Sequence, residues 1–284
     1  MSTTPKPNTS DVTPLAIDAD LVTDLLVGFL RDEVRKVGYD RVVLGLSGGI
    51  DSAVTAALAV RALGADAVVP ILMPYRTSSG ASTADALAVC ASLGMEPVTV
   101  NITPQIDAYF SGQPDADRHR RGNKMARERM SILYDLSWKH RALVAGTSNK
   151  TELLLGYGTI HGDMASALNP LGDLYKTQVF TVAAHLGLPT QVINKQPSAD
   201  LWQGQSDEDE LGFSYAAVDA LLYAMVDERR SSAELRGMAF DDAFVTDVSR
   251  RVRESQYKRR PPVIAKLGTR TIDRDFRYPR DWGH

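Results

Sequence analysis

The residues best suited to chemistry lie in one short stretch, Ser47-Gly48-Gly49-Ile50-Asp51-Ser52, between an apolar run and a helical pattern. Glycines let a backbone approach an anion closely, and the serines add hydroxyl donors. The following helix would turn its unpaired N–H groups and its positive dipole end toward the same point. We expect this loop to grip the pyrophosphate of a nucleotide, with Asp51 where a magnesium ion would bridge the phosphates.

Two common phosphate-binding motifs do not fit this loop. No Lys-Ser or Lys-Thr follows the glycines as in a Walker loop, and the dinucleotide pattern G-x-G-x-x-G is absent. An ordinary glycine-rich turn between a strand and a helix is the simplest alternative. The pattern S-G-G-x-D-S instead resembles the PP-loop of N-type ATP pyrophosphatases, which split ATP between the α and β phosphates and transfer AMP to a substrate oxygen.

Composition narrows the class of protein. With 284 residues and 44% hydrophobic content, the chain can bury the core of one large α/β domain. A formal net charge of −3 gives no overall attraction to nucleic acid, so we expect none as a partner. No apolar run approaches the roughly 18 residues that a membrane span needs. The single cysteine, Cys90, excludes an internal disulfide, fits a reducing cytoplasm and lies in a helical pattern typical of a small core residue.

Hydrophobic periodicity predicts alternating strands and helices. Strands are predicted over 41–46, 67–73, 97–100 and 142–147, and helices over 21–37, 52–63, 82–93, 115–140, 177–186, 215–228 and 240–257. This order indicates a doubly wound, mostly parallel α/β sheet flanked by helices, with extra C-terminal helices. If the first and fourth strands flank the topological switch point, Asp51 and the residues after Gly146 meet in one crevice.

The ends and loops of the chain also carry predictions. We expect a flexible tail over 1–15, one domain over 16–262 and a basic, irregular tail over 263–284. The glycine-rich stretch 156–176 is predicted to be a long functional loop. Lys176 begins a helix, where a cation is unfavourable unless an anion lies nearby. The acidic run 207–210 is predicted to be a solvated loop or helix cap.

Four further segments carry a more specific resemblance. Gly122-Asn-Lys-Met-Ala-Arg-Glu-Arg-Met130, the stretch from Gly146-Thr147 to Glu152, Pro197-Ser-Ala-Asp-Leu201 and Lys258-Arg-Arg-Pro-Pro262 stand in this order. They resemble motifs of the NAD synthetase family, and the similarity runs over 18–262. The resemblance implies an adenine nucleotide alpha hydrolase-like fold and ATP-dependent amidation of deamido-NAD with ammonia, through an acyl-adenylate. It also implies Mg²⁺ and a homodimer that binds deamido-NAD across its interface.

Carried over position by position, the resemblance implies roles for individual residues. The residues implied to bind ATP are Gly45, Leu46, Ser47, Gly48, Gly49, Ile50, Asp51, Ser52, Thr147, Lys176 and Ser198. The residues implied to bind deamido-NAD are Arg127, His161, Asp163, Tyr257 and Lys258. Asp51 and Glu152 match the magnesium ligands, and the catalytic set is Asp51, Asp163 and Lys176, with Asp163 as a base near the entering ammonia.

The chain departs from the commonest ammonia-using pattern in the loop over 156–176. Ile160 and Ala167 replace a lysine and an aspartate that contact deamido-NAD in the family, and Gly162-Asp-Met164 resembles the glutamine-dependent enzymes. We expect free ammonia as the nitrogen donor, because the lone cysteine has no glutaminase-like surroundings. A synthetase subunit supplied with ammonia by a separate glutaminase is the alternative.

Two other functions compete with this one. Another PP-loop ligase or amidotransferase, such as GMP synthetase, would keep the loop and change the substrate. A non-catalytic adenine-nucleotide sensor would keep the loop and lose the chemistry, but the presence of Asp51, Glu152 and Lys176 argues against it.

Overall fold

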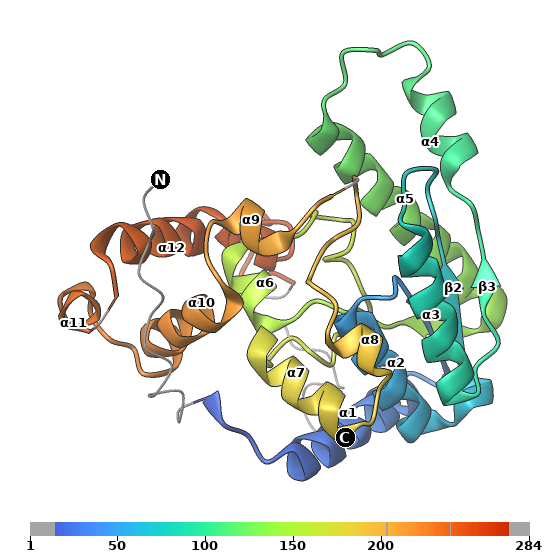
Figure 1. The fold of residues 1–284 in the computed structure, drawn as a ribbon, viewed down its shortest axis with the longest axis horizontal. Coiled ribbons are helices and arrows are strands. Elements are labelled where there is room, and N and C mark those ends of the chain that lie inside the picture. Colours follow the sequence, from blue (N-terminus) through green and yellow to red (C-terminus); the bar gives the residue numbers. More distant parts are fainter. Residues whose placement is uncertain (1–14, 203, 239, 273–284) are drawn as a thin grey trace.

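The centre of the fold is a parallel sheet of four strands in the order β3-β2-β1-β4 (Figure 1). The computed structural model describes residues 15–202, 204–238 and 240–272. The strands are β1 (Arg41–Gly45), β2 (Val68–Leu72), β3 (Val98–Thr99) and β4 (Ala142–Val144). The chain winds outward from β1 to β3 and then returns to place β4 against the other side of β1. The predicted switch point between the first and fourth strands is therefore confirmed.

Helices cover both faces of this sheet, as the predicted doubly wound fold requires. One face packs on α1 (Ala19–Lys36), α2 (Ile50–Leu63), α3 (Gly80–Leu93) and α7 (Lys176–His185). The other face packs on α4 (Thr103–Phe110) and α5 (Arg118–His140). Val42 and Leu44 belong to the first core and Val43 to the second, because successive strand residues point to opposite faces.

A third core lies among the C-terminal helices, at the opposite end of the molecule from α4 (Figure 1). The helices beyond the sheet are α6 (Lys150–Leu155), α8 (Thr190–Ile193), α9 (Asp207–Leu211), α10 (Tyr215–Leu222), α11 (Ser232–Gly237) and α12 (Asp242–Glu254). A π-helical turn, Tyr223–Asp227, extends α10, and a 3-10 turn, Gln256–Arg259, follows α12. The extra C-terminal helices are thus confirmed.

Most predicted elements occur within a few residues of their expected bounds. The short helices α4, α6, α8, α9 and α11 were not predicted, and the third strand is shorter than expected. Cys90 is buried in α3, as predicted.

Among the helices of the described residues, none has the length and apolar character that a membrane span needs. Residues 1–14 and 273–284 of the predicted tails lie outside the described residues, and the division into one domain and two tails stays a prediction.

Candidate active site

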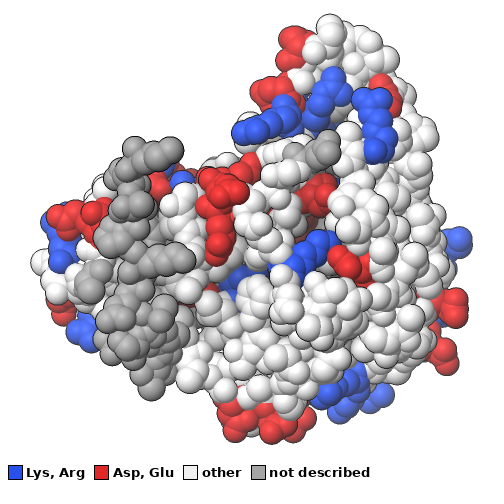
Figure 2. Space-filling model, viewed as in Figure 1, with Lys and Arg blue, Asp and Glu red and all other residues white. Residues whose placement is uncertain are grey.

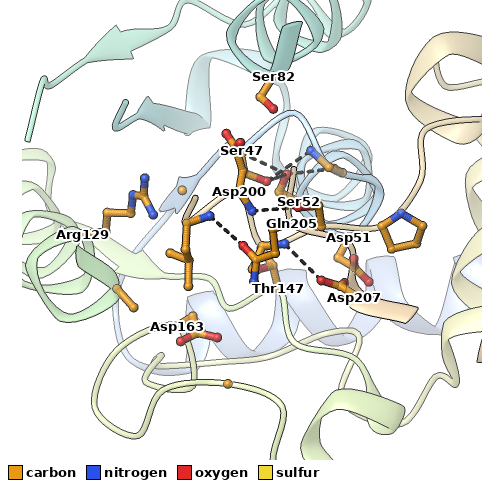
Figure 3. A pocket seen from close by; sticks show the side chains of 18 of the residues that line it. Ser47, Asp51, Ser52, Ser82, Arg129, Thr147, Asp163, Asp200, Gln205 and Asp207 are labelled. Carbon is orange, nitrogen blue, oxygen red and sulfur yellow. Dashed lines mark hydrogen bonds between the residues drawn. The ribbon is translucent and has the colours of Figure 1, made fainter. Parts of the chain in front are cut away.

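A cleft of about 690 Å³ opens at the carboxyl ends of the strands, where the switch point predicted it. Its walls come from the loop after β1, the end of β2, the loop after β4 and the segment before α9 (Figure 3). In the space-filling view, acidic and basic side chains meet around the hollow in the middle of this face (Figure 2). The predicted residues that line the cleft are Gly45, Leu46, Ser47, Gly49, Ile50, Asp51, Ser52, Thr147, Glu152, Asp163, Lys176, Ser198 and Lys258.

The loop after β1 is held in shape by its own hydroxyl groups. The Gly49 N–H donates to Ser47 Oγ at 3.2 Å, and Ser52 Oγ donates to the Gly49 carbonyl at 3.0 Å. The two serine hydroxyls lie 3.2 Å apart. Because α2 begins at Ile50, its unpaired N–H groups and positive dipole end face the cleft, as an anion site requires.

Gly48 belongs to this loop but does not line the cleft. Its backbone faces the start of α3. Its φ of +80° is in the left-handed region, and a Cβ atom built there would lie 2.1 Å from the Ser82 carbonyl oxygen at the start of α3. The backbone therefore needs glycine at this position both for its conformation and for its close approach to α3.

A buried ammonium between two carboxylates marks one wall of the cleft. Lys176 Nζ lies 2.5 Å from Asp51 Oδ2 and 3.3 Å from Glu152 Oε1. Lys176 is only 2% exposed; burial acts to lower its pKa, but the neighbouring Asp51 and Glu152 raise it above the ordinary value for lysine. The anion expected near this helix start is therefore present as two carboxylates of the protein. These three side chains come from the first turn of α2, from α6 and from α7.

The carboxyl group of Glu152 has a raised pKa. Burial, followed by repulsion from Asp51, raises the pKa of Glu152 to about 8, although Lys176 acts in the opposite direction. A carboxyl group with such a pKa is poised to gain from a further cation beside it.

Asn149 orients the carboxyl groups of Asp51 and Glu152, a role that the sequence analysis did not predict. Its Nδ2 donates to Asp51 Oδ1 at 2.9 Å, and its backbone N–H donates to Glu152 Oε2 at 3.3 Å. The Glu152 N–H in turn donates to Asn149 Oδ1 at 2.9 Å, which completes a capping box at the start of α6. The spacing N-x-x-E was the available signal, because it is a capping box pattern.

The prediction that the acidic run over 207–210 is a solvated loop or helix cap was wrong. The run forms α9, and Asp207 is 4% exposed. Asp207 Oδ1 accepts a hydrogen bond from Tyr157 Oη at 2.9 Å and Oδ2 accepts one from Tyr215 Oη at 3.1 Å. Burial raises the pKa of Asp207, while Lys176 lowers it. Asp207 is thus a further acidic residue in the lining of the cleft, besides Asp51, Glu152 and Asp163.

Asp163 lies on the opposite side of the cavity from Asp51 in Figure 3. Its Oδ1 accepts the Thr159 N–H at 2.8 Å, which ties the carboxylate to the loop before it. Although the side chain faces the open cleft, surrounding protein atoms desolvate it and raise its pKa, against the effect of that hydrogen bond. A carboxylate with a raised pKa is better suited to accept a proton near neutral pH.

Three of the residues expected to bind deamido-NAD lie outside the lining of the cleft. Arg127 is exposed on α5 and its Nε donates to the Ile160 carbonyl at 3.1 Å. His161 is exposed, with a φ of +60°, and Tyr257 is 62% exposed. Lys258 lines the cleft, but its ammonium donates to the carbonyls of Gly156 and Gly158, at 2.8 and 2.9 Å.

Two cations in the cleft were not assigned to it from the sequence. Arg129 lines the cavity, and its Nε donates to the Met73 carbonyl at 3.1 Å, so it lies at the end of β2. Lys195 Nζ lies 2.8 Å from Asp85 Oδ2 and 3.0 Å from Ser82 Oγ, beside the loop that contains Gly48. The second arginine of the motif over 122–130 was a signal for Arg129, whereas Lys195 had none.

The chain is similar to known proteins along most of its length. The family model described as NAD synthase matches residues 22–262. The NH(3)-dependent NAD(+) synthetase of Trichlorobacter lovleyi is 59% identical over 269 residues, which cover 95% of this chain and 98% of that protein.

Two solved structures have the same fold. The NH3-dependent NAD synthetase of Campylobacter jejuni is 36% identical with a TM-score of 0.76, over 88% of this chain and all of that one. The NMN synthetase of Francisella tularensis is 31% identical with a TM-score of 0.78, over 89% of this chain and all of that one.

Proposed function

The chain belongs to the NAD synthase family, and from this premise we propose that its cleft converts deamido-NAD to NAD with ATP and ammonia. The resemblance read from the sequence motifs is confirmed by the family model and the relatives. The observation that carries the proposal is the ammonium of Lys176 held between Asp51 and Glu152, beside the loop that begins α2.

The reaction has two steps whose atoms balance. An oxygen of the nicotinate carboxylate attacks the α phosphorus of ATP, the bond to the β phosphate breaks, and pyrophosphate leaves. Ammonia then attacks the acyl carbon, AMP leaves with the oxygen, and the new amide nitrogen loses a proton. A carboxylate is a poor electrophile, whereas an acyl-adenylate has a good leaving group, so the protein mainly has to position substrates and stabilise charge.

The pyrophosphate of ATP is proposed to lie on the loop Ser47–Ser52. The unpaired N–H groups at the start of α2 and the hydroxyls of Ser47 and Ser52 are donors suited to phosphate oxygens. Lys176 adds a positive charge on the same wall, where little water competes with it. Thr147 and Ser198 are proposed to contact ATP through their hydroxyls, and both line the cleft.

The donor set suits a magnesium ion. The described residues contain no group of three or more His, Cys, Asp or Glu arranged for a metal, but Mg²⁺ usually keeps several waters and takes one or two carboxylates plus substrate phosphates. Asp51 and Glu152 would hold it, and the raised pKa of Glu152 indicates room for more positive charge. When bound, the ion would neutralise charge on the phosphates of ATP.

Asp163 is proposed to take the proton that the attacking nitrogen loses. Its raised pKa and its position in the cleft support this role. Ammonia itself would come from solution, in keeping with the NH3-dependent activity for which two relatives are named. A separate glutaminase subunit remains the competing source.

The deamido-NAD site is proposed to be completed by a second copy of the chain. Arg127, Tyr134 and Trp138 recur at helical spacing on α5, and all three are exposed, Trp138 by 85%. A homodimer that covers this face would place Arg127 at the interface, where its guanidinium could bind a carboxylate or phosphate. We likewise propose that His161, Tyr257 and Lys258 contact deamido-NAD.

We propose a cytoplasmic location for the protein, in keeping with its single buried thiol.

Isotope exchange tests the function. Labelled pyrophosphate should enter ATP only when deamido-NAD is present, because reversal of adenylylation needs the carboxylate. Nicotinate mononucleotide serves as the competing carboxylate, since one structural relative is named an NMN synthetase. A nucleotide sensor would show no exchange with either compound, and exchange only with the mononucleotide would assign a different substrate.

A further inference from the structure

A buried carboxylate that does not line the cleft links α6 and α7, two helices whose residues Glu152 and Lys176 do line it. Asp219, on α10, is 0% exposed. Its Oδ1 accepts a hydrogen bond from Thr151 Oγ1 at 2.5 Å. Its Oδ2 accepts two more, from the Thr177 N–H and from Thr177 Oγ1, both at 2.8 Å.

The two threonines are the chain neighbours of the charged residues of the active site. Thr151 precedes Glu152 at the start of α6, and Thr177 follows Lys176 at the start of α7. Thr151 Oγ1 also accepts the Lys176 N–H at 3.0 Å, so one hydroxyl links α6 to α7 directly. The carboxylate thus fixes the backbone of both residues that approach Asp51.

Burying the Asp219 carboxylate costs desolvation energy, so a role beyond filling space in the core is expected for this side chain. Burial raises the pKa of Asp219, and the hydrogen bonds from Thr151 and Thr177 oppose that rise. Two helix starts also face the carboxylate, and a negative charge there is favourable. A leucine would fill a similar volume in the C-terminal core without the desolvation cost, but it would leave the Thr177 N–H without its acceptor.

We propose that Asp219 is a positioning residue, which sets the register of α6 against α7 and so holds Glu152 and Lys176 at their distances from one another and from Asp51. Asp219 acts through Thr151 and Thr177 and touches no substrate. The inference rests on the proposed function, because it concerns the rate of NAD formation. Displacements of about 1 Å at a reacting centre can cost about 10²-fold in rate.

Three variants and a control test the proposal. Asp219→Leu removes all the hydrogen bonds, Asp219→Asn keeps the shape and an acceptor, and Thr177→Val removes one donor while it keeps the Thr177 N–H. Ser214→Ala is the control: it removes the N-terminal cap of the same helix, an Oγ that accepts the Ala217 N–H, without a link to Thr151 or Thr177. The readouts are kcat per folded molecule, KM for deamido-NAD and pyrophosphate exchange into ATP.

The expected order of kcat is wild type, then Asp219→Asn and Thr177→Val, then Asp219→Leu. We expect Asp219→Leu to lose about 10²-fold, with KM for deamido-NAD changed less than threefold and the exchange rate falling in parallel with kcat. Ser214→Ala should lose thermal stability and keep its kcat.

Equal kcat per folded molecule in Asp219→Asn, Thr177→Val and the wild type would overturn the inference, and these two milder variants decide the matter if Asp219→Leu does not fold. A fall in kcat for Ser214→Ala as large as that for Asp219→Asn would also overturn it, because general loosening of α10 would then suffice. A wild type that forms no NAD would instead refute the proposed function.

Discussion

Lys176 Nζ lies 2.5 Å from Asp51 Oδ2, although 125 positions of sequence separate the two residues. The contact joins the start of α7 to the first turn of α2, next to the loop proposed to bind pyrophosphate. Because Glu152 approaches the same ammonium from α6, the protonation of each of these three groups depends on the other two. Substitutions here should therefore change both chemistry and stability.

Lys176→Met should nearly abolish turnover. It removes a buried positive charge from the wall that faces the phosphates and leaves Asp51 and Glu152 without their shared partner. We expect kcat to fall about 10²- to 10³-fold, the range seen when one preorganised charge-stabilising donor is lost. The measurement is steady-state NAD formation. Lys150→Met is the matched control, because Lys150 pairs with Asp173 and Asp227 outside the cleft lining; a similar loss there would argue against a specific role for Lys176.

Glu152→Gln should stabilise the metal-free protein at alkaline pH while it lowers activity. With a pKa raised from 4.5 to about 8 in the folded state, Glu152 keeps a proton that the unfolded chain releases. The free energy of unfolding of the wild type therefore falls as the pH rises through this window. The variant cannot ionise, so it should gain stability relative to the wild type between pH 5 and pH 8.5, measured by urea unfolding without metal.

Glu234→Gln provides a control of opposite sign for that experiment. Hydrogen bonds from Ser231 lower the pKa of Glu234, so its ionised form stabilises the fold above the ordinary glutamate pKa and this contribution is lost as the pH falls. This variant should lose stability relative to the wild type at pH 8.5. If Glu152→Gln also lost stability there, the charge balance described for the site would be wrong.

Gly48→Ala should lower the affinity for ATP, an effect that goes beyond the loss of stability expected from backbone strain alone. The added methyl group would meet the Ser82 carbonyl at 2.1 Å, so the loop must move away from α3. Gly64→Ala is a close control, because Gly64 also has a positive φ, +91°, but no atom within 4 Å of the new Cβ. Both variants should lose about 1 kcal/mol or more from backbone strain. By calorimetric titration with ATP, only Gly48→Ala should lose affinity, and equal affinities would count against the proposed phosphate loop.

Trp138→Lys should dissociate the proposed homodimer. It puts a charge on the exposed apolar face of α5 that also contains Tyr134. Leu25→Lys is the control on α1, where Leu25 is 63% exposed. Light scattering should give a dimer for the wild type and Leu25→Lys and a monomer for Trp138→Lys, whose KM for deamido-NAD should rise. A wild type that is an active monomer would refute the dimer.

The sequence predicted what local patterns determine. The buried strands over 41–46 and 67–73 were recognisable because parallel strands covered on both faces are nearly continuous apolar runs. The phosphate loop was recognisable because glycines and hydroxyls are concentrated in a few adjacent positions. Helix α6 was missed because six residues are too few for a clear period.

Contacts between distant segments explain the other misses. Asp207 was predicted to be solvated because charge runs usually are, yet Tyr157, 50 positions away, and Tyr215 enclose it. Asn149 contacts Asp51 across 98 positions, and Asp219 contacts Thr151 across 68. A single sequence contains no pattern that pairs such positions, since their partnership is created by the folded arrangement of α6, α7 and α10.

The most direct test of the central claim is NAD formation by the purified chain with ATP, magnesium and deamido-NAD, with ammonium or glutamine as nitrogen donor. The account predicts NAD, AMP and pyrophosphate in equal amounts with ammonium, no turnover with glutamine, and no turnover by Asp51→Ala. Efficient use of glutamine by the pure protein, or full activity of Asp51→Ala, would contradict it.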